Sequence, residues 1–348
     1  MKAASLRVLT CALVLASVTT ASAERSDIEP NLGTWLRGLF VDLTPKPVTL
    51  AVIGDSPYGA AQIVDFPNYI AHINADEDVG RVVHVGDIKN GSTRCDDSYF
   101  AFIEEQFATF EDPLVYTPGD NEWTDCHRSN NGKYDPLERL TAVRDVFYAE
   151  PSRTLGGEQR PLLTQAFMPG YRDIPENQLW TQSRVLLATL HVVGSRNGLA
   201  PWFGDDTTDA LLDDPMRRLA EVEHRTAAAL AWLKLSFALA DKLKTKGVVL
   251  FMQADTWPGG QDDGFAAILQ QLAELALEYG KPVLVIQGDT HAYKTDQPLL
   301  NGDAVHGITA QVPNLTRIVV QGETTSEWLK LHIDPRTPEV FSWQRVMR

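Results

Sequence analysis

The chain of 348 residues has 46 acidic and 31 basic side chains, a formal net charge of −15 at pH 7, and 44% hydrophobic residues. This hydrophobic content indicates a globular protein and excludes extensive disorder, and three cysteines are too few for a disulfide-rich scaffold. The acidic balance argues against a general binder of nucleic acid or of anionic membranes, which would need basic surface. It is compatible with cation binding if the acidic groups are clustered.

The first residues have the features of an export signal. Lys2 and Arg7 precede a short apolar run that ends at Ala16, and small residues follow up to Ala23. This pattern predicts a signal peptide over residues 1–23, cleaved after Ala23, and a secreted or periplasmic mature protein. The apolar run is too short to span a bilayer, and a buried N-terminal helix is the alternative.

The mature chain, residues 24–348, is expected to form a single α/β domain. Its strand candidates are continuous runs of Val, Ile and Leu, as in strands buried on both faces. They are Val48–Ile53, Arg81–Val85, Pro113–Tyr116, Arg184–Val193, Val248–Gln253 and Pro282–Gln287. The expected helices are Ala60–Ala75, Asp97–Phe110, Pro136–Ala149, Pro215–Thr245 and Phe265–Tyr279. This alternation predicts βαβ units and a mainly parallel sheet.

The C-terminal part departs from the alternation. Arg317–Gln321 and Trp328–Ile333 have the composition of strands, and the turn-like sequence Gly322-Glu323-Thr324-Thr325 separates them. We therefore expect an antiparallel hairpin on a second sheet.

Aspartate follows directly after five of the expected strands. The five are Asp55, Asp87, Asp120, Asp255 and Asp289, and glycine precedes four of them. In an open α/β sheet, ligands bind beyond the carboxyl ends of the strands. These carboxylates are therefore expected to converge, with Asn121, Glu122 and His291 beside them.

A cluster of this kind needs positive charge. Two carboxylates about 5 Å apart repel each other by roughly 3 kcal/mol at an effective dielectric constant of 20, and Lys89 is the only cation near the motifs. A single aspartate after a strand is more often a turn residue or a helix cap. Five of them, with His291 two residues after the last, favour a metal site. Oxygen ligands with an imidazole suit Mn, Fe, Zn or Mg.

In order and spacing, these motifs resemble those of the calcineurin-like metallophosphoesterases, which include the purple acid phosphatases. The family pattern is D-x-H, then GD-x-x-(D/N), then GNH-(D/E), then a strand ending in His, then G-H-x-H. The corresponding segments here are Asp55-Ser56-Pro57-Tyr58, Gly86-Asp87-Ile88-Lys89-Asn90, Gly119-Asp120-Asn121-Glu122, Met252-Gln253-Ala254-Asp255 and Gly288-Asp289-Thr290-His291. The resemblance covers most of the mature chain and implies a sandwich of two mixed β-sheets flanked by helices.

The resemblance also implies two divalent metal ions. Asp87 corresponds to the carboxylate that bridges them, and Asp55 and His291 correspond to ligands of one ion. The ligands of the second ion would be Asp120 or Asn121, Asp255 or Gln253, and Asp289. This second set is richer in oxygen than the family pattern, which moves the expected metal toward Mn, Mg or Ca, with Fe and Zn as the other candidates.

Several histidines of the family pattern are replaced. Pro57 stands at one such position, and the third motif lacks the usual general-acid histidine, with Asn121 following its aspartate. A leaving alkoxide needs a proton donor, for which His127 and His191 are the candidates. His191 lies in an apolar run and reads more readily as a structural strand residue. Tyr58 is a candidate metal or phosphate contact, or a packing residue.

The resemblance implies an exported, metal-dependent phosphoesterase that hydrolyses phosphate mono- or diesters of small molecules. One alternative is a binding or scaffold protein that kept the fold after losing catalysis, and another is a hydrolase of other esters with the same metal site. No G-x-S-x-G motif supports a serine hydrolase. We expect neither a nucleic-acid-binding surface nor a membrane span after signal cleavage.

Cys95 and Cys126 are expected to form a disulfide. Cys95 lies eight residues after Asp87, and Cys126 lies six residues after Asp120. Because these aspartates end two strands expected to be neighbours, the loops should lie within the Cα separation of about 4.4–6.8 Å that a disulfide requires. An even cysteine count in an exported chain favours the bond, and two separate buried thiols are the alternative.

Overall fold

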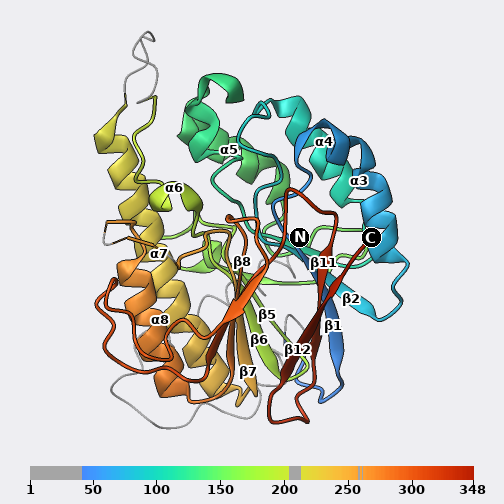
Figure 1. The fold of residues 1–348 in the computed structure, drawn as a ribbon, viewed down its shortest axis with the longest axis vertical. Helices are drawn as coiled ribbons and strands as arrows, with labels where there is room; N and C mark the ends of the chain where they lie inside the picture. The colour runs from blue at the N-terminus through green and yellow to red at the C-terminus, as the bar shows by residue number, and fades with distance from the viewer. Residues whose placement is uncertain (1–40, 204–212, 258, 261) are drawn as a thin grey trace, which may run out of the picture.

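The computed structural model describes residues 41–203, 213–257, 259–260 and 262–348. The predicted signal peptide lies outside the described residues. Two mixed β-sheets lie face to face, and helices cover the outer face of each (Figure 1). The architecture confirms the α/β sandwich expected from the sequence. In the described ranges, no helix is long and apolar enough to cross a membrane.

The first sheet has five strands in the order β12-β11-β1-β2-β3. Its strands are β1 (Val48–Ile53), β2 (Val79–His84), β3 (Leu114–Tyr116), β11 (Trp328–Ile333) and β12 (Phe341–Val346). The first three are parallel, and β11 and β12 add antiparallel pairs at one edge. Its outer face packs against α3 (Gly59–Asn74), α4 (Asp97–Phe107) and α5 (Pro136–Phe147).

The second sheet has seven strands in the order β4-β5-β6-β7-β8-β10-β9. They are β4 (Leu163–Thr164), β5 (Gln178–Gln182), β6 (Val185–Thr189), β7 (Gly247–Phe251), β8 (Val283–Gln287), β9 (Lys294–Asp296) and β10 (Leu315–Val319). The run from β6 through β7 and β8 to β10 is parallel, and the edges are antiparallel. Helices α7 (Pro215–Lys242) and α8 (Ala266–Tyr279) cover its outer face.

The core between the sheets explains the continuous apolar runs. Val52 and Val83 of the first sheet and Leu187 and Val249 of the second belong to one fully buried cluster between the two sheets. Alternate residues of the same strands pack outward against helices. Burying a Val, Leu or Ile contributes about 1.5–3 kcal/mol, so a strand covered on both sides gains from apolar residues at every position.

Local signals set the ends of the long helices. Asp214 precedes α7, and its side chain accepts a hydrogen bond from the backbone N–H of Arg217 (3.1 Å), while Pro215 occupies the first turn. Gly280 ends α8 in the left-handed conformation (φ 66°), which glycine adopts without steric cost. Both helices therefore begin or end where the sequence supplies the capping residue.

The expected C-terminal hairpin is wrong. β10 pairs in parallel with β8 in the seven-stranded sheet, whereas β11 pairs with β1 and β12 in the five-stranded sheet. The segment between β10 and β11 crosses from one sheet to the other past the end of β1, where the Glu323 N–H donates to the Asp55 carbonyl (2.9 Å). Apolar composition indicates that a strand is buried, but which strand it pairs with depends on how the two sheets assemble.

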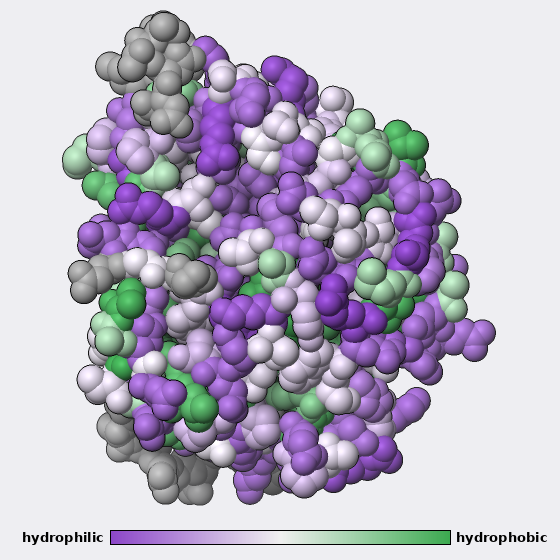
Figure 2. All heavy atoms as spheres, viewed as in Figure 1, coloured by the Kyte–Doolittle hydropathy of each residue, from purple (hydrophilic) through white to green (hydrophobic). Residues whose placement is uncertain are grey.

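Figure 2 shows that the face of Figure 1 is mostly hydrophilic, with apolar residues in small separate groups. Large continuous apolar patches mark interaction surfaces on many proteins, and the coloured residues of this face form none.

Candidate metal centre

Four of the five motif aspartates lie together where the carboxyl ends of the two sheets meet. Asp55 follows β1, Asp87 follows β2, Asp120 follows β3 and Asp289 follows β8. The Asp289 N–H donates to Asp55 Oδ1 (3.0 Å). The carboxylates of Asp120 and Asp289 each lie 2.8 Å from the position that a Cβ on Gly194 would take. The predicted convergence of these carboxylates is thus found in the structure.

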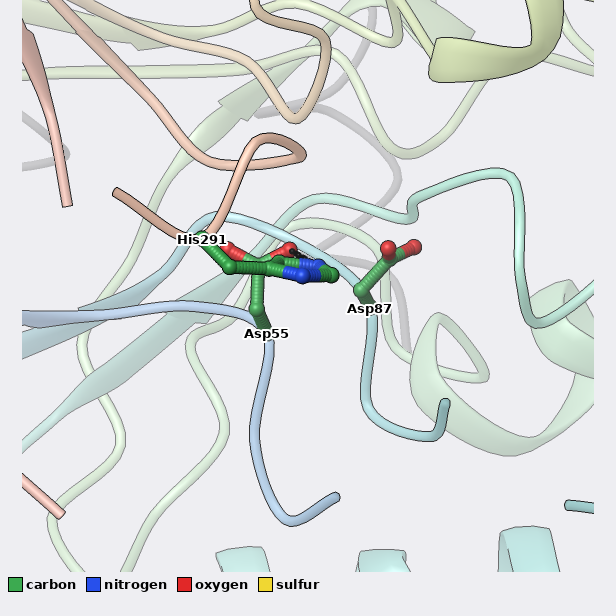
Figure 3. Close-up of side chains that lie close together, drawn as sticks. All are labelled: Asp55, Asp87 and His291. Atoms are coloured by element: carbon green, nitrogen blue, oxygen red, sulfur yellow. Dashed lines mark ion pairs between the residues drawn. The ribbon is translucent and has the colours of Figure 1, made fainter. Parts of the chain in front are cut away.

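Asp55, Asp87 and His291 form the tightest group, which we call the ligand triad (Figure 3). One ligand atom from each lies within 4.8 Å of the other two. His291 Nε2 is 3.3 Å from Asp55 Oδ1, and its Nδ1 is 3.0 Å from Glu323 Oε2. Glu323 therefore orients the ring so that Nε2 faces the aspartates, the arrangement that carboxylates give to metal-binding histidines.

Two atoms of the ligand triad support its fit to a cation. Asp55 Oδ2 is buried and has no hydrogen-bond partner, and the buried His291 Nε2 lies 3.3 Å from Asp55 Oδ1 without a well-aligned hydrogen bond. Burying a polar group without a partner costs roughly 1–3 kcal/mol, so such atoms at functional sites call for a ligand. Two carboxylates and one imidazole are ordinary ligands of Mn, Fe and Zn. The residues present therefore fit one divalent ion.

Asp87 is held by hydrogen bonds on both carboxylate oxygens. Oδ2 accepts from the Tyr58 hydroxyl (2.8 Å), Asn121 Nδ2 (2.8 Å) and Gln253 Nε2 (3.2 Å). Oδ1 accepts from the Asn121 backbone N–H (3.2 Å). Tyr58, for which the sequence left a ligand or packing role open, thus contacts the cluster through its hydroxyl.

The residues predicted for a second ion are linked by hydrogen bonds. Asp120 Oδ1 accepts from Gln253 Nε2 (3.1 Å), and Asp120 Oδ2 accepts from Ser195 Oγ (2.7 Å). Across the described ranges, the ligand triad is the one group of His, Cys, Asp or Glu side chains close enough to share an ion. The ligand roles of Asp120, Asn121 and Asp289 stay predictions.

Asp255 touches the cluster through its backbone, whose N–H donates to Asp289 Oδ2 (3.3 Å), while its carboxylate has other partners. Its carboxylate lies 2.5 Å from Nη1 of the buried Arg317 and accepts from Thr290 Oγ1 (3.0 Å). Gln253, not Asp255, contacts Asp87 and Asp120. Of the two alternatives at this motif, the structure therefore brings Gln253 into the cluster and pairs Asp255 with an arginine.

The electrostatics of the cluster call for a cation. Burial raises the pKa of Asp55, and burial together with neighbouring carboxylates raises the pKa values of Asp87 and Asp289 well above normal. For Asp87, the charges on Asp120 and Glu122 add most to the effect of burial. Full ionisation of this cluster therefore requires positive charge close by.

Backbone strain is concentrated in the same motifs. The left-handed region is occupied by Asp55 (φ 50°), Asp87 (φ 57°), Asp289 (φ 72°) and His291 (φ 57°). This conformation costs a non-glycine residue roughly 1–2 kcal/mol, and such strain is typical of functional sites. Neighbouring glycines provide the space that these aspartate side chains occupy. A Cβ on Gly119 would collide with Asp87, and a Cβ on Gly288 would collide with Asp55.

Glu122 accepts hydrogen bonds from the loops of two motifs. Its Oε1 accepts from the backbone N–H groups of Gly119 (2.7 Å) and Asp87 (3.1 Å) and from the Tyr116 hydroxyl (2.7 Å). One buried carboxylate thereby connects the second and third motifs.

The two candidate proton donors lie in different surroundings. His191 is completely buried, with Nδ1 2.7 Å from Glu176 and its ring edge-on to Trp123. His127 Nδ1 accepts from the Phe203 N–H (2.9 Å), and its ring packs against Phe203. His191 lies just after β6 and not in a strand, and the catalytic role of either histidine stays a prediction.

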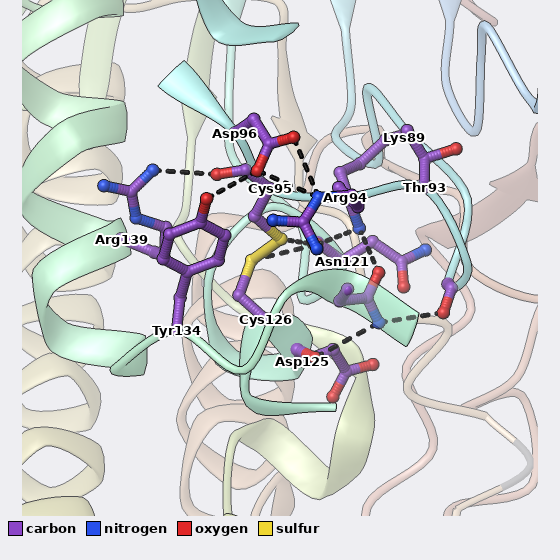
Figure 4. The surroundings of a disulfide bond; sticks show 12 residues. Lys89, Thr93, Arg94, Cys95, Asp96, Asn121, Asp125, Cys126, Tyr134 and Arg139 are labelled. Atoms are coloured by element: carbon purple, nitrogen blue, oxygen red, sulfur yellow. Dashed lines mark hydrogen bonds and ion pairs between the residues drawn. A yellow bond between two sulfur atoms is a disulfide. The ribbon is translucent and has the colours of Figure 1, made fainter. Parts of the chain in front are cut away.

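The predicted disulfide is present. Cys95 and Cys126 are bonded, with their Cα atoms 5.9 Å apart, and join the loops that follow β2 and β3 (Figure 4). Beside the bond, buried Lys89 donates from Nζ to the Asn121 carbonyl (2.6 Å) and to Asn131 Oδ1 (3.0 Å). The loops carrying Asp87 and Asp120 are thus joined covalently and by hydrogen bonds.

Two residues at the centre carry no sequence signal. Glu323, which orients His291, lies in the segment predicted to be a hairpin turn. Ser195 reaches Asp120 from a short left-handed segment, where its φ is 49°. Neither belongs to a motif, because tertiary contacts alone bring these segments to the centre.

Comparison with known proteins shows the family of this chain. The calcineurin-like phosphoesterase family model matches residues 48–293, and no curated protein sequence matches the chain. Similar solved structures include a dimetal phosphatase from Danio rerio (12% identity, TM-score 0.49, 86% of this chain and 98% of that one). Another is GAP50, the anchor in the inner membrane complex of Plasmodium (10% identity, TM-score 0.42, 86% of this chain and 89% of that one). A third is purple acid phosphatase PPD1 from yellow lupin seeds (11% identity, TM-score 0.40, 87% of this chain and 54% of that one). These likenesses are distant, whereas the family match spans most of the chain and includes every motif of the centre. The chain belongs to the calcineurin-like phosphoesterase family.

Proposed function

We propose that the protein is an exported, metal-dependent phosphoesterase that hydrolyses small phosphate mono- or diesters. The observation that carries the proposal is the ligand triad, in which Asp55 Oδ2 is buried without a hydrogen-bond partner and His291 Nε2 lies 3.3 Å from Asp55 Oδ1. The disulfide supports export, because such bonds persist in oxidising compartments. Mn, Fe, Zn, Mg and Ca are the candidate metals.

A divalent ion, when bound, would supply Lewis acidity and positive charge for a phosphoryl group. The chain's own residues form the binding site for this ion. Asp55 and Asp87 supply the negative charge, and Glu323 holds the His291 ring. Tyr58 and Asn121 hold the Asp87 carboxylate through hydrogen bonds of 2.8 Å. A preorganised donor set of this kind needs little rearrangement during the reaction.

One side of the centre is open to solvent. The His291 side chain is 26% exposed and that of Glu323 is 52% exposed, whereas Asp55 is completely buried. Thr290, between Asp289 and His291, is exposed as well. A small ester can therefore approach past the loop after β8.

Replacing His291 with alanine is expected to lower the bound metal without unfolding the protein. The side chain is partly exposed, so its loss leaves no large core cavity, but it removes the only imidazole of the ligand triad. Metal analysis after dialysis and a thermal melt would measure the two effects. Unfolding with an unchanged metal content would instead assign His291 a structural role.

Turnover is expected to depend steeply on the leaving group. The general-acid histidine of the family pattern is absent from the third motif, where Asn121 follows Asp120. General acid catalysis contributes roughly 10²–10⁴-fold, so esters of acidic phenols should react faster than alkyl esters by about this factor. The measurement is kcat/KM across a series of aryl and alkyl phosphates. A flat dependence would reveal a proton donor.

Turnover of aryl phosphate mono- and diesters by the mature chain, with added Mn or Zn, tests the proposal directly. The replaced histidines favour one rival, a binding protein that kept the fold after losing catalysis. That rival predicts a full metal complement without turnover of any such ester. Measuring metal content and turnover on the same sample separates the two.

A further inference from the structure

Gln253 occupies the space between the two carboxylates that a second ion would share. It follows β7 and is completely buried. Its Nε2 donates to Asp87 Oδ2 (3.2 Å) and to Asp120 Oδ1 (3.1 Å). One NH2 group thus bridges the carboxylate assigned to both ions and the carboxylate assigned to the second ion.

The backbone determines which end of this amide faces the carboxylates. Gln253 Oε1 accepts a hydrogen bond from the Gly194 N–H (2.6 Å). A backbone N–H can only donate, so the oxygen must face Gly194 and the NH2 group must face Asp87 and Asp120. Turning the amide over would place two donors against each other at Gly194 and an oxygen against two carboxylates.

The Gln253 side chain also has no room to move aside. A Cβ on Gly86 would lie 2.7 Å from Gln253 Cβ, and one on Gly119 would lie 2.7 Å from Gln253 Cγ. Its stem therefore lies directly on the backbone of the glycines before Asp87 and Asp120. Packing and the hydrogen bond from Gly194 hold the amide in one place.

An NH2 group in this position cannot ligate a metal, because it has no available lone pair. It also shares Asp87 Oδ2 with the donors Tyr58 and Asn121. The three donors around Asp87 Oδ2 occupy its lone pairs, whereas Oδ1 accepts from the Asn121 backbone N–H and keeps a second lone pair for the ion of the ligand triad. The ligand triad, in contrast, keeps Asp55 Oδ2 without a hydrogen-bond partner.

We propose that the protein binds one divalent ion, at the ligand triad, and that the Gln253 amide takes the place of the second ion. The proposal rests on the metal centre of the proposed function and concerns the number of its ions. It departs from the two ions that the family resemblance implies. According to this proposal, Gln253 is the residue that determines how many metal ions bind.

Metal stoichiometry tests this proposal without reference to activity. The mature protein would be dialysed against excess Mn²⁺ and then against metal-free buffer, and the bound Mn would be measured per chain. Electron paramagnetic resonance would separate an isolated Mn²⁺ ion from an exchange-coupled pair. We expect one ion per chain and the spectrum of an isolated ion.

The variant Gln253→His replaces the NH2 group with an imidazole lone pair and is expected to bind two ions with a coupled spectrum. Gln253→Leu removes the amide without adding a ligand and is expected to keep one ion. Gln159→His, at an exposed position, controls for metal binding by any added histidine and should also keep one.

The outcomes separate this inference from the proposed function. Two coupled ions in the natural protein would overturn the inference and leave a metal-dependent phosphoesterase intact. No bound ion would overturn both. One ion in a folded Gln253→His variant would show that Gln253 does not determine the count, and would overturn the inference as well.

Discussion

Replacing Asp87 with asparagine is expected to remove bound metal and activity together. Asp87 accepts four hydrogen bonds while it contributes to the ligand triad. The NH2 group of an asparagine must take the position of either Oδ2, facing the donors Tyr58 and Gln253, or Oδ1, facing the Asn121 backbone N–H. Either orientation loses an acceptor, and the negative charge is lost in both. The fall in metal affinity should exceed the roughly 10–100-fold loss caused by removing only a partner of a ligand.

The control for this prediction separates metal loss from unfolding. In the presence of a chelator, Asp87→Asn should remain folded, because the loss of an acceptor is offset by the removal of a carboxylate whose pKa is raised by burial and by neighbouring charges. Asp145→Asn, on the exposed side of α5, removes the same charge elsewhere and should leave both metal and turnover unchanged. Metal analysis, thermal melts with chelator and ester turnover are the measurements. An Asp87→Asn protein that keeps both its metal and its activity would refute the ligand assignment.

Replacing both Cys95 and Cys126 with serine is expected to lower the free energy of unfolding by about 3–4 kcal/mol. The bond closes a segment with a sequence separation of 31 residues, for which the chain-entropy model gives that value. Both sulfur atoms lie in the core, 3.6 Å from the Asn121 carbonyl. The loss should also loosen the loops that carry Asp87 and Asp120. Urea unfolding of the oxidised protein and of the double variant would measure the difference.

A reducing agent provides the internal control for the disulfide. It should lower the urea midpoint of the natural protein but leave that of the double variant unchanged. Metal affinity, measured on both proteins under native conditions, would show whether the bond also maintains the geometry of the centre. Equal midpoints for oxidised natural protein and double variant would mean that the bond contributes nothing to stability.

The metal centre was predictable where the ligands follow parallel strands. Asp55, Asp87, Asp120 and Asp289 could be placed because the carboxyl ends of such strands meet at one edge, whatever the details of packing. The choice between Asp255 and Gln253 was not predictable, because both follow the same strand. A buried arginine from β10, Arg317, pairs with Asp255, and the Gly194 N–H holds Gln253.

By itself, the sequence determined the alternation of strands and helices, the convergence of the motif carboxylates and the disulfide between neighbouring loops. These features depend on local composition and on the order of elements along the chain. Only the tertiary structure decided that β10 and β11 belong to different sheets, that Glu323 thereby reaches His291, and that an amide lies between Asp87 and Asp120. The physical reason is that strand pairing and side-chain orientation depend on partners distant in sequence. Local composition indicates that a strand or side chain is buried, but it does not indicate which residues pack against it.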